Sequence, residues 1–398
     1  MRIISNREIF FRHIAQTSFA PIALEIVRAQ GIFQYDTSGK QYIDLISGFS
    51  VANIGHSHPK VIKAVKEQAE RYMHLIVYGE FIESPQTAYA NLLVNHLPAS
   101  LDCVYFTNSG AEATEGAMKL AKRATGRANI ISFNNSYHGS TQGALSVMGD
   151  EYYRNAFRPL LPGIIHVDYN SNEVFHFIDE DTSCVILETI QAESGLNVPD
   201  KSWMQQLRSK CTKHGALLIL DEIQAGFGRT GTLWAFEQFD IIPDILLLGK
   251  ALGGGMPLGA FISNKELMKQ LSFNPVLGHI TTFGGHPVSC AAGKAAFEVL
   301  LNEHCIETVK DKESILLSQL NHPAIKRFNH FGLWASLQFN TAENAQNIIH
   351  RCVEKGCITD WFLFAPDCLR IAPPLTINEG EIIKACSIIT ESINEEAV

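Results

Sequence analysis

The middle of the 398-residue chain alternates short hydrophobic runs with longer segments in which hydrophobic residues recur every three or four positions. The short runs have the length of buried strands, and they cover residues 103–107, 129–133, 184–188, 216–221, 244–248 and 258–263. The longer segments predict helices at 111–124, 202–214 and 287–301. Such alternation is typical of βαβ units, so the pattern predicts an α/β fold with a mostly parallel central sheet covered by helices.

The C-terminal third of the chain has a different pattern. It predicts a strand at 332–339, a helix at 342–355 and a short strand at 369–372 before Pro373 and Pro374. This order predicts a second, smaller α+β domain. A chain of this length exceeds the usual size of a single hydrophobic core, which also favours two domains.

Composition excludes several classes of protein. The net charge of −9 argues against a general nucleic-acid or membrane surface, and no apolar stretch has the length of a membrane span. The segment from Met1 to Glu8 lacks the apolar core of a signal peptide. Nine cysteines without a C-x-x-C pair indicate reduced thiols in a cytoplasmic protein, with no metal site expected.

Two residues of opposite charge stand at or just beyond the ends of predicted strands. Asp221 ends the run at 216–221, and Lys250 stands two residues beyond the run at 244–248. In a parallel sheet, ligands gather beyond the carboxyl ends of the strands. Pyridoxal 5′-phosphate (PLP) needs a lysine amine and an acidic partner for its pyridine nitrogen, so the pair suggests a PLP site. Taken alone, a surface lysine and a strand-end aspartate are the commoner interpretation.

Two further segments fit a cofactor site. Ser109 and Glu112 match a capping box, and a helix that begins at Gly110 and Ala111 would offer backbone N–H groups to a phosphate. Tyr137, followed by His138, comes after the strand at 129–133 and could stack on a pyridine ring. An ordinary capped helix and a core tyrosine are the alternatives.

Two other motifs are interpreted as structural. Residues 226–231 match G-x-G-x-x-G, but the segment does not turn directly from a strand into a helix, so a loop is predicted rather than a dinucleotide site. His56 and His58 lack nearby metal-ligating partners, and Pro59 follows them. They therefore predict a turn before a helix.

Assembled in order, these motifs resemble the class III aminotransferases, the PLP-dependent family that includes ornithine, acetylornithine and 4-aminobutyrate aminotransferases. The resemblance runs from about Phe19 to the C-terminal region. It rests on residues 42–45, 55–59, 108–113, 221–224, 226–231, 248–255, 281–287 and 370–375. It implies a fold-type I PLP-dependent transferase, with a large PLP-binding domain at 46–288 and a small domain formed by 1–45 and 289–398.

The resemblance also implies roles for individual residues. Lys250 matches the Schiff-base lysine that then shuttles a proton, and Asp221 matches the carboxylate that keeps the pyridine nitrogen protonated. Ser109, Gly110 and Ala111 match the phosphate seat, Tyr137 and His138 the ring-contacting segment, and Gln224 the partner of the phenolic oxygen. Thr282 matches the threonine that reaches the cofactor of the partner subunit, which implies a homodimer with shared active sites.

Substrate recognition is implied at a second group of residues. Glu193 and Arg370 match the family's carboxylate switch, in which the glutamate pairs with the arginine until the carboxylate of glutamate or 2-oxoglutarate arrives. Phe19 and Phe49 belong to the region that shapes the outer pocket, and neither can bind a carboxylate. Ser140 stands where ornithine-type relatives carry an arginine for the far carboxylate, which favours a less acidic or more apolar amine. Arg154 or Arg158 could compensate.

The sequence therefore predicts an aminotransferase that moves an amino group from an ω-amino acid or related ornithine-like amine to 2-oxoglutarate by a ping-pong mechanism. The alternative within the fold is a PLP-dependent aminomutase or decarboxylase. A binding protein that has lost catalysis is a further alternative, and Lys250 together with Asp221 argues against it.

Overall fold

The computed structural model describes residues 5–396. The signal-peptide prediction concerned residues 1–8, and the first four of these lie outside the described residues. Helices of the described chain are α1 (Asn6–His13), α2 (Ser47–Ser50), α3 (Pro59–Arg71), α4 (Ser84–Val94), α5 (Gly110–Thr125), α6 (Gln142–Ser146), α7 (Glu151–Arg154), α8 (Val174–Phe177), α9 (Lys201–His214), α10 (Lys265–Met268), α11 (Pro287–Asn302), α12 (Val309–Gln319), α13 (Ala342–Glu354) and α14 (Glu379–Glu396). None of the helices within residues 5–396 is long and apolar enough to cross a membrane.

The strands within residues 5–396 form three sheets. Seven make the large sheet, in the order β4 (Cys103–Thr107), β10 (Gly259–Ser263), β9 (Ile245–Leu248), β8 (Leu217–Asp221), β7 (Thr182–Glu188), β5 (Asn129–Phe133) and β6 (Ile164–Val167). A four-stranded sheet joins β1 (Ile26–Gln30), β2 (Phe33–Asp36), β3 (Gln41–Asp44) and β13 (Cys357–Ile358). The third contains β11 (Arg327–His330), β12 (Ala335–Gln338), β15 (Ala365–Ile371) and β14 (Trp361–Phe362).

The large sheet is mostly parallel, because only β10 runs antiparallel to its neighbours. Every residue of β7 is buried, as expected for a strand that is covered on both faces. Side chains alternate between two cores: Cys184 and Ile186 pack on the side of α5, whereas Val185 and Leu187 pack on the side of α9. The predicted α/β fold class is confirmed.

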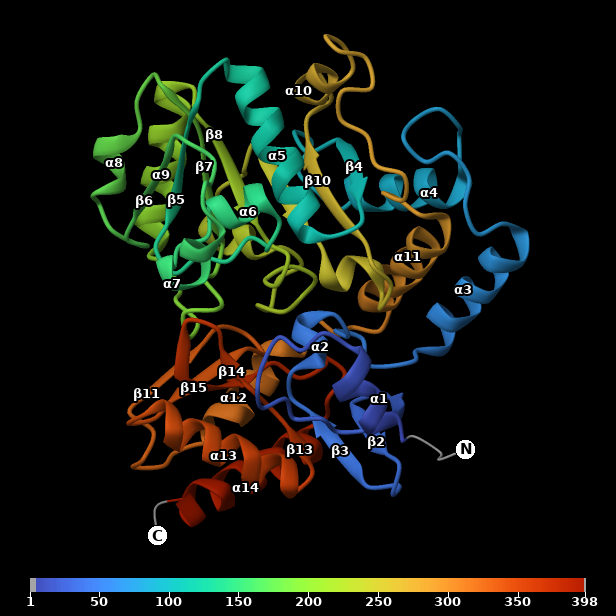
Figure 1. Ribbon diagram of the computed structural model, residues 1–398, viewed down its shortest axis with the longest axis vertical. Coiled ribbons are helices and arrows are strands. Elements are labelled where there is room, and N and C mark those ends of the chain that lie inside the picture. The colour runs from blue at the N-terminus through green and yellow to red at the C-terminus, as the bar shows by residue number, and fades with distance from the viewer. Residues whose placement is uncertain (1–4, 397–398) are drawn as a thin grey trace.

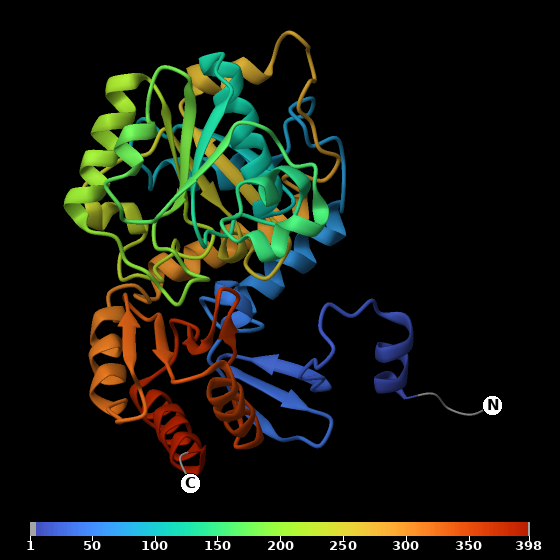
Figure 2. The ribbon, with the colours of Figure 1, turned by 60° about the vertical axis from the view of Figure 1, so that its left-hand side comes forward.

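The elements lie in two parts. The large sheet with its helices forms the upper part of Figure 1, and the two smaller sheets with α12, α13 and α14 form the lower part. Figure 2 shows α1 standing away from both parts on an extended segment. The domain limits at 45/46 and 288/289 stay a prediction.

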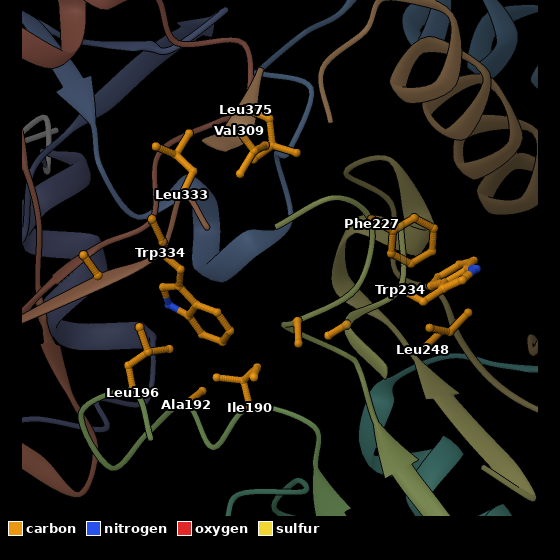
Figure 3. Packing of buried hydrophobic residues seen from close by; sticks show 14 of the residues in the cluster. Ile190, Ala192, Leu196, Phe227, Trp234, Leu248, Val309, Leu333, Trp334 and Leu375 are labelled. Carbon is orange, nitrogen blue, oxygen red and sulfur yellow. The ribbon is translucent and has the colours of Figure 1, made fainter. Parts of the chain in front are cut away.

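A hydrophobic core joins the two parts. Leu333, Trp334 and Leu375 from the C-terminal part and Phe227 and Trp234 from the large part belong to one buried cluster (Figure 3). The loop at 226–231 contributes a buried cation to this junction, since Arg229 donates to the carbonyl oxygens of Leu333 and Pro373. The loop interpretation of the glycine motif is confirmed, and the segment fixes the junction that surrounds the site.

Candidate active site

A cavity of about 250 Å³ opens beyond the carboxyl ends of the large sheet. The register aligns Glu188 of β7 with Asp221 of β8, and Lys250 follows β9 beside them. The residues that line the cavity come from strand ends and the loops after them: Ser109, Gly110, Ala111, Tyr137, His138, Gly139, Ser140, Glu188, Ile190, Asp221, Ile223, Gln224, Ala225 and Lys250. Parallel strands therefore bring together most of the site residues predicted from sequence.

One wall of the cavity is the N-terminus of α5. Ser109 caps the helix, and its hydroxyl accepts a hydrogen bond from the backbone N–H of Glu112 at 3.2 Å. The predicted capping box is wrong in its second half, because the Glu112 carboxylate accepts from the backbone N–H and the side chain of Asn108 instead. A Cβ atom on Gly110 would lie 2.5 Å from the terminal Cδ1 of Ile223, so a larger residue here would require the Ile223 side chain to shift. The free N–H groups and positive dipole end of α5 suit a phosphate.

Asp221 is held by a histidine. Its Oδ2 atom lies 2.7 Å from Nδ1 of His138, and both side chains are buried. The other oxygen, Oδ1, accepts from the backbone N–H of Ile223 at 2.9 Å. The carboxylate is thereby fixed in orientation at the floor of the cavity, where it suits a protonated pyridine nitrogen.

Lys250 stands where the chain leaves β9. The residue has a φ of 49°, in the left-handed region, and a short 3₁₀ turn begins there. Removal from water lowers the pKa of its amine to about 8, and the negative charge of Glu193 opposes this shift. About a tenth of the amine is therefore uncharged near pH 7, far more than for an ordinary lysine, and the uncharged form is the one that a nucleophile and proton carrier requires.

Tyr137 and Ser140 form another part of the cavity lining. The tyrosine hydroxyl lies 3.1 Å from Oγ of Ser140, and its backbone N–H donates to Glu188 at 2.9 Å. Glu188 also accepts from the backbone N–H of Ala192, and burial raises the pKa of this carboxyl well above its usual range. Glu188 was not predicted from sequence, although it ends a buried strand in the same way as Asp221.

Glu193 and Arg370 form a buried bidentate pair. The guanidinium donates from Nη1 to Oε1 at 3.1 Å and from Nη2 to Oε2 at 2.8 Å. Burial opposes ionisation of Glu193, but the charge of Arg370 outweighs it and lowers the pKa of the carboxyl to about 2. Gln224 donates from Nε2 to Oε1 of Glu193 at 3.0 Å, which connects this pair to the cavity.

Phe49 lies between the two charged regions. Its ring centroid is 5.2 Å from the guanidinium carbon of Arg370 and 6.0 Å from the Lys250 amine. The backbone of α2 has φ values of 60° at Gly48 and 63° at Phe49, so the chain turns sharply to present this ring. The structure thus places Phe49 near Lys250 and Arg370, and its part in shaping the outer pocket stays a prediction.

Thr282 lies apart from the cavity. The residue is exposed and is not among the lining residues. Its neighbour Thr281 accepts a hydrogen bond from the Asn108 side chain at 2.8 Å, which anchors this segment beside β4. The other predicted cofactor residues all line the cavity.

The two arginines that could compensate for Ser140 are engaged elsewhere. Arg154 pairs with Glu151 at 2.7 Å and donates to the carbonyl oxygen of Met148. Arg158 is ion-paired with the same glutamate. Neither lines the cavity.

The two predicted turn histidines have structural partners. His58 caps α3 by accepting from the backbone N–H of Lys60 at 3.3 Å. His56 lies 2.7 Å from the buried carboxylate of Asp44. The prediction of a turn before a helix is confirmed.

Comparisons with known proteins agree on one family. Residues 14–393 match the family described as aminotransferase class-III. The acetylornithine aminotransferase of Methanopyrus kandleri is 38% identical over 386 residues, which cover 96% of each chain. The ornithine aminotransferase 1 of Staphylococcus aureus (strain Mu50) is 38% identical over 387 residues, covering 93% of this chain and 94% of that protein.

Solved structures give the same result. The ornithine aminotransferase of Toxoplasma gondii superposes with a TM-score of 0.91 at 28% identity, covering 99% of this chain and 96% of that one. The fold and the cavity define a fold-type I PLP-dependent transferase. The chain belongs to the class III aminotransferases, and it is a PLP-dependent aminotransferase. The comparisons lend no support to an aminomutase or decarboxylase.

The cavity fits the cofactor on its own chemistry. The N-terminus of α5 would receive the phosphate, the Asp221 carboxylate would meet the pyridine nitrogen, and Lys250 supplies the amine. Gln224 has a buried Oε1 atom that lacks a hydrogen-bond partner among the described residues, as expected for a side chain that faces a ligand.

Proposed function

We propose that the enzyme moves an amino group from an amine donor that lacks a far carboxylate to a 2-oxo acid, with 2-oxoglutarate as the acceptor. The bidentate Glu193–Arg370 pair beside the cavity carries the acceptor half of this proposal. An arginine fork matches a carboxylate, and Glu193 can neutralise the arginine while no carboxylate substrate is bound. Removal of either partner would leave a buried charge unpaired at a cost of several kcal/mol, so alternation between two carboxylates is favoured.

The donor half rests on the wall around Ser140. Ser140 offers a hydroxyl, the aromatic ring of Phe49 lies 6.0 Å from the Lys250 amine, and Arg154 and Arg158 are ion-paired with Glu151. Without a cation there, a donor with a negatively charged far end would lose its solvation and gain no partner. A monoamine or a diamine suits this wall better, and these donors keep the ω-amino group of the ornithine-like class.

The residues of the site divide the work. When bound, PLP withdraws electrons from the amine carbon and makes its proton labile. Lys250 would carry that proton between the substrate and cofactor carbons, since its lowered pKa leaves a free amine. Asp221, oriented by His138, would hold the proton on the pyridine nitrogen. Gln224 has a second amide N–H beyond the one donated to Glu193, and this group would reach the phenolic oxygen.

The remaining cofactor contacts follow from the walls of the cavity. Ser109, Gly110 and Ala111 would bind the phosphate, and Tyr137 would cover the face of the ring. A ping-pong cycle would use the same cavity twice. Glu193 stays on Arg370 during the donor half and swings away during the acceptor half.

A homodimer would complete the site. Thr282 is exposed in the single chain and stands next to the exposed Phe283. Phe283 contacts His74, at the start of the segment that carries the exposed Phe81 and Ile82. Large exposed apolar side chains on neighbouring segments are typical of an interface. We propose that Thr282 reaches the cofactor phosphate of the partner subunit. Nine unpaired cysteines favour a reducing, cytoplasmic location.

Matched pairs of donors test the proposal. The absorbance of the bound cofactor is followed while ornithine or putrescine, which differ by one carboxylate, is added without an acceptor. We expect putrescine to convert the cofactor faster than ornithine, and 2-oxoglutarate to restore it. Faster conversion by ornithine would contradict the donor assignment, and restoration by pyruvate but not by 2-oxoglutarate would contradict the acceptor assignment.

A further inference from the structure

Arg370 has a second carboxylate partner that the sequence motifs did not indicate. Asp360 stands between β13 and β14, and its Oδ1 atom lies 3.1 Å from Nε of Arg370. The backbone N–H of Arg370 donates to the carbonyl oxygen of Asp360 at 2.8 Å, so the two residues are held together by main chain as well. The side chains are 1% exposed for Arg370 and 13% exposed for Asp360.

The contact is mainly electrostatic. Neither Nε of Arg370 nor Oδ1 of Asp360 has an aligned hydrogen-bond partner within residues 5–396. The two terminal nitrogens of the guanidinium donate to Glu193. The guanidinium carbon lies 4.2 Å from the ring centroid of Phe362 and 5.2 Å from that of Phe49. The arginine is therefore enclosed on every side, and Asp360 acts on it chiefly through its charge.

We propose that Asp360 is a specificity-determining residue, whose negative charge beside Arg370 weakens the binding of the carboxylate of the 2-oxo acid. The inference rests on the proposed acceptor site at Arg370. Glu193 lies beside the cavity and already experiences the charge of Asp360 while it is paired with the arginine. Because it is part of the same chain, it stays within reach of that charge after it leaves the arginine. An arriving substrate carboxylate comes from water and experiences the full repulsion. Asp360 thereby shifts the balance toward the closed Glu193–Arg370 pair and toward amine donors that do not need the fork.

The repulsion should depend on pH. Burial raises the pKa of the Asp360 carboxyl to about 6, and the charge of Arg370 opposes this shift. The charged groups that act most strongly on Asp360 are Arg370 on β15, Glu193 in the loop after β7 and Asp44 at the end of β3. Oδ2 of Asp44 lies at hydrogen-bond distance, 2.7 Å, from Nε2 of His56. As pH rises through about 6, Asp360 gains its charge, and binding of the acceptor carboxylate weakens.

The test compares the wild-type enzyme with Asp360→Asn, which keeps an oxygen near Nε and removes only the charge. Two quantities are measured between pH 5.5 and 8.5. The first is the Michaelis constant (KM) for 2-oxoglutarate, and the second is the dissociation constant for glutarate, a dicarboxylate without a reactive oxo group, determined by calorimetry. Asp367→Asn is the matched control, because this residue lies on the same strand as Arg370 and contacts Gln338 away from the cavity.

At pH 8 the variant should bind both compounds roughly tenfold more tightly than the wild type, as expected for removing a like charge a few ångströms away. The ratio should fall toward one as pH decreases through about 6, and the KM for the amine donor should change little. The control should match the wild type throughout. Equal affinities for variant and wild type across the range would overturn the role of Asp360.

Two further results separate a failure of the inference from a failure of the acceptor site. If Asp360→Asn fails to fold, the inference is tested on the wild-type enzyme alone. Its KM for 2-oxoglutarate must then rise as pH increases through about 6, and a KM that does not rise would overturn the role of Asp360. Should glutarate binding and 2-oxoglutarate turnover be absent, or be unaffected by Arg370→Gln, the proposed acceptor site fails and this inference fails with it. Arg370-dependent binding without any effect of Asp360→Asn would overturn only the inference.

Discussion

At the cofactor end of the cavity, Asp221 and Lys250 follow neighbouring strands of one sheet, whereas at the substrate end Glu193 and Arg370 meet across 177 residues of sequence. The first pair is positioned by two hydrogen-bonded strands, with Asp221 opposite Leu247 and Lys250 three residues further along the chain. The second pair consists of two long side chains that hold each other, and in the proposed cycle both exchange partners. In this proposal the architecture of the sheet positions the residues for the chemistry, and the exchangeable ion pair sets the choice of substrate.

The largest effect is expected at the fixed end. Lys250→Ala should lower the rate of amino transfer by about 10³- to 10⁴-fold, because Lys250 is the one lysine among the described residues that line the cavity, and its amine moves the proton. Single-turnover conversion with saturating donor measures this step. Lys265→Ala, at an exposed lysine on α10, serves as the control and should leave the rate unchanged. A loss of less than tenfold would show that the fixed end does not carry the chemistry.

The next effect falls at the exchangeable end. Arg370→Gln should reduce kcat/KM for 2-oxoglutarate by about 10²-fold, since a broken buried pair costs about 3 kcal/mol or more. The donor half-reaction should change less, because the donor does not need the fork. Steady-state kinetics with each substrate varied in turn separate the two, and Arg327→Gln on β11 is the matched control. Equal losses in both half-reactions would contradict the division of the cavity into two ends.

The pH dependence of cofactor uptake sharpens the description of the fixed end. Lys250 reacts as the free amine, and its pKa is lowered to about 8. Uptake of PLP by the apo-protein should therefore accelerate by about tenfold per pH unit below pH 8 and level off above it. Stopped-flow absorbance measures the rate. A rate that keeps rising toward pH 10 would mean that the amine is not desolvated as the structure indicates.

The smallest effect is expected at the wall around Ser140. Ser140→Arg should raise the preference for ornithine over putrescine by roughly tenfold, the value of one charge-assisted hydrogen bond. Ser140→Gln adds length without charge and should leave the preference nearly unchanged. The ratio of the two conversion rates is the measurement. Equal preferences in the two variants would show that the charge at position 140 does not decide whether a donor with a far carboxylate is accepted.

The sequence by itself determined the fold class and the fixed end of the site. Strands such as 216–221 are continuous hydrophobic runs because both faces are buried, so Asp221 and Lys250 could be placed at strand ends from the pattern alone. Family motifs then supplied Glu193, Arg370 and Phe49. The strand β6 was missed, because its four residues are mostly half-buried and carry little periodic signal.

Only the tertiary structure decided which charges neutralise one another. The chain does not show that Asp360 lies beside Nε of Arg370, that Arg154 and Arg158 are taken by Glu151, or that Glu112 turns to Asn108. Strand ends are set by the local hydrophobic pattern, which a sequence records directly. Ion pairs depend on side chains that meet from distant segments and compete for partners, and that competition is settled only when the chain is packed.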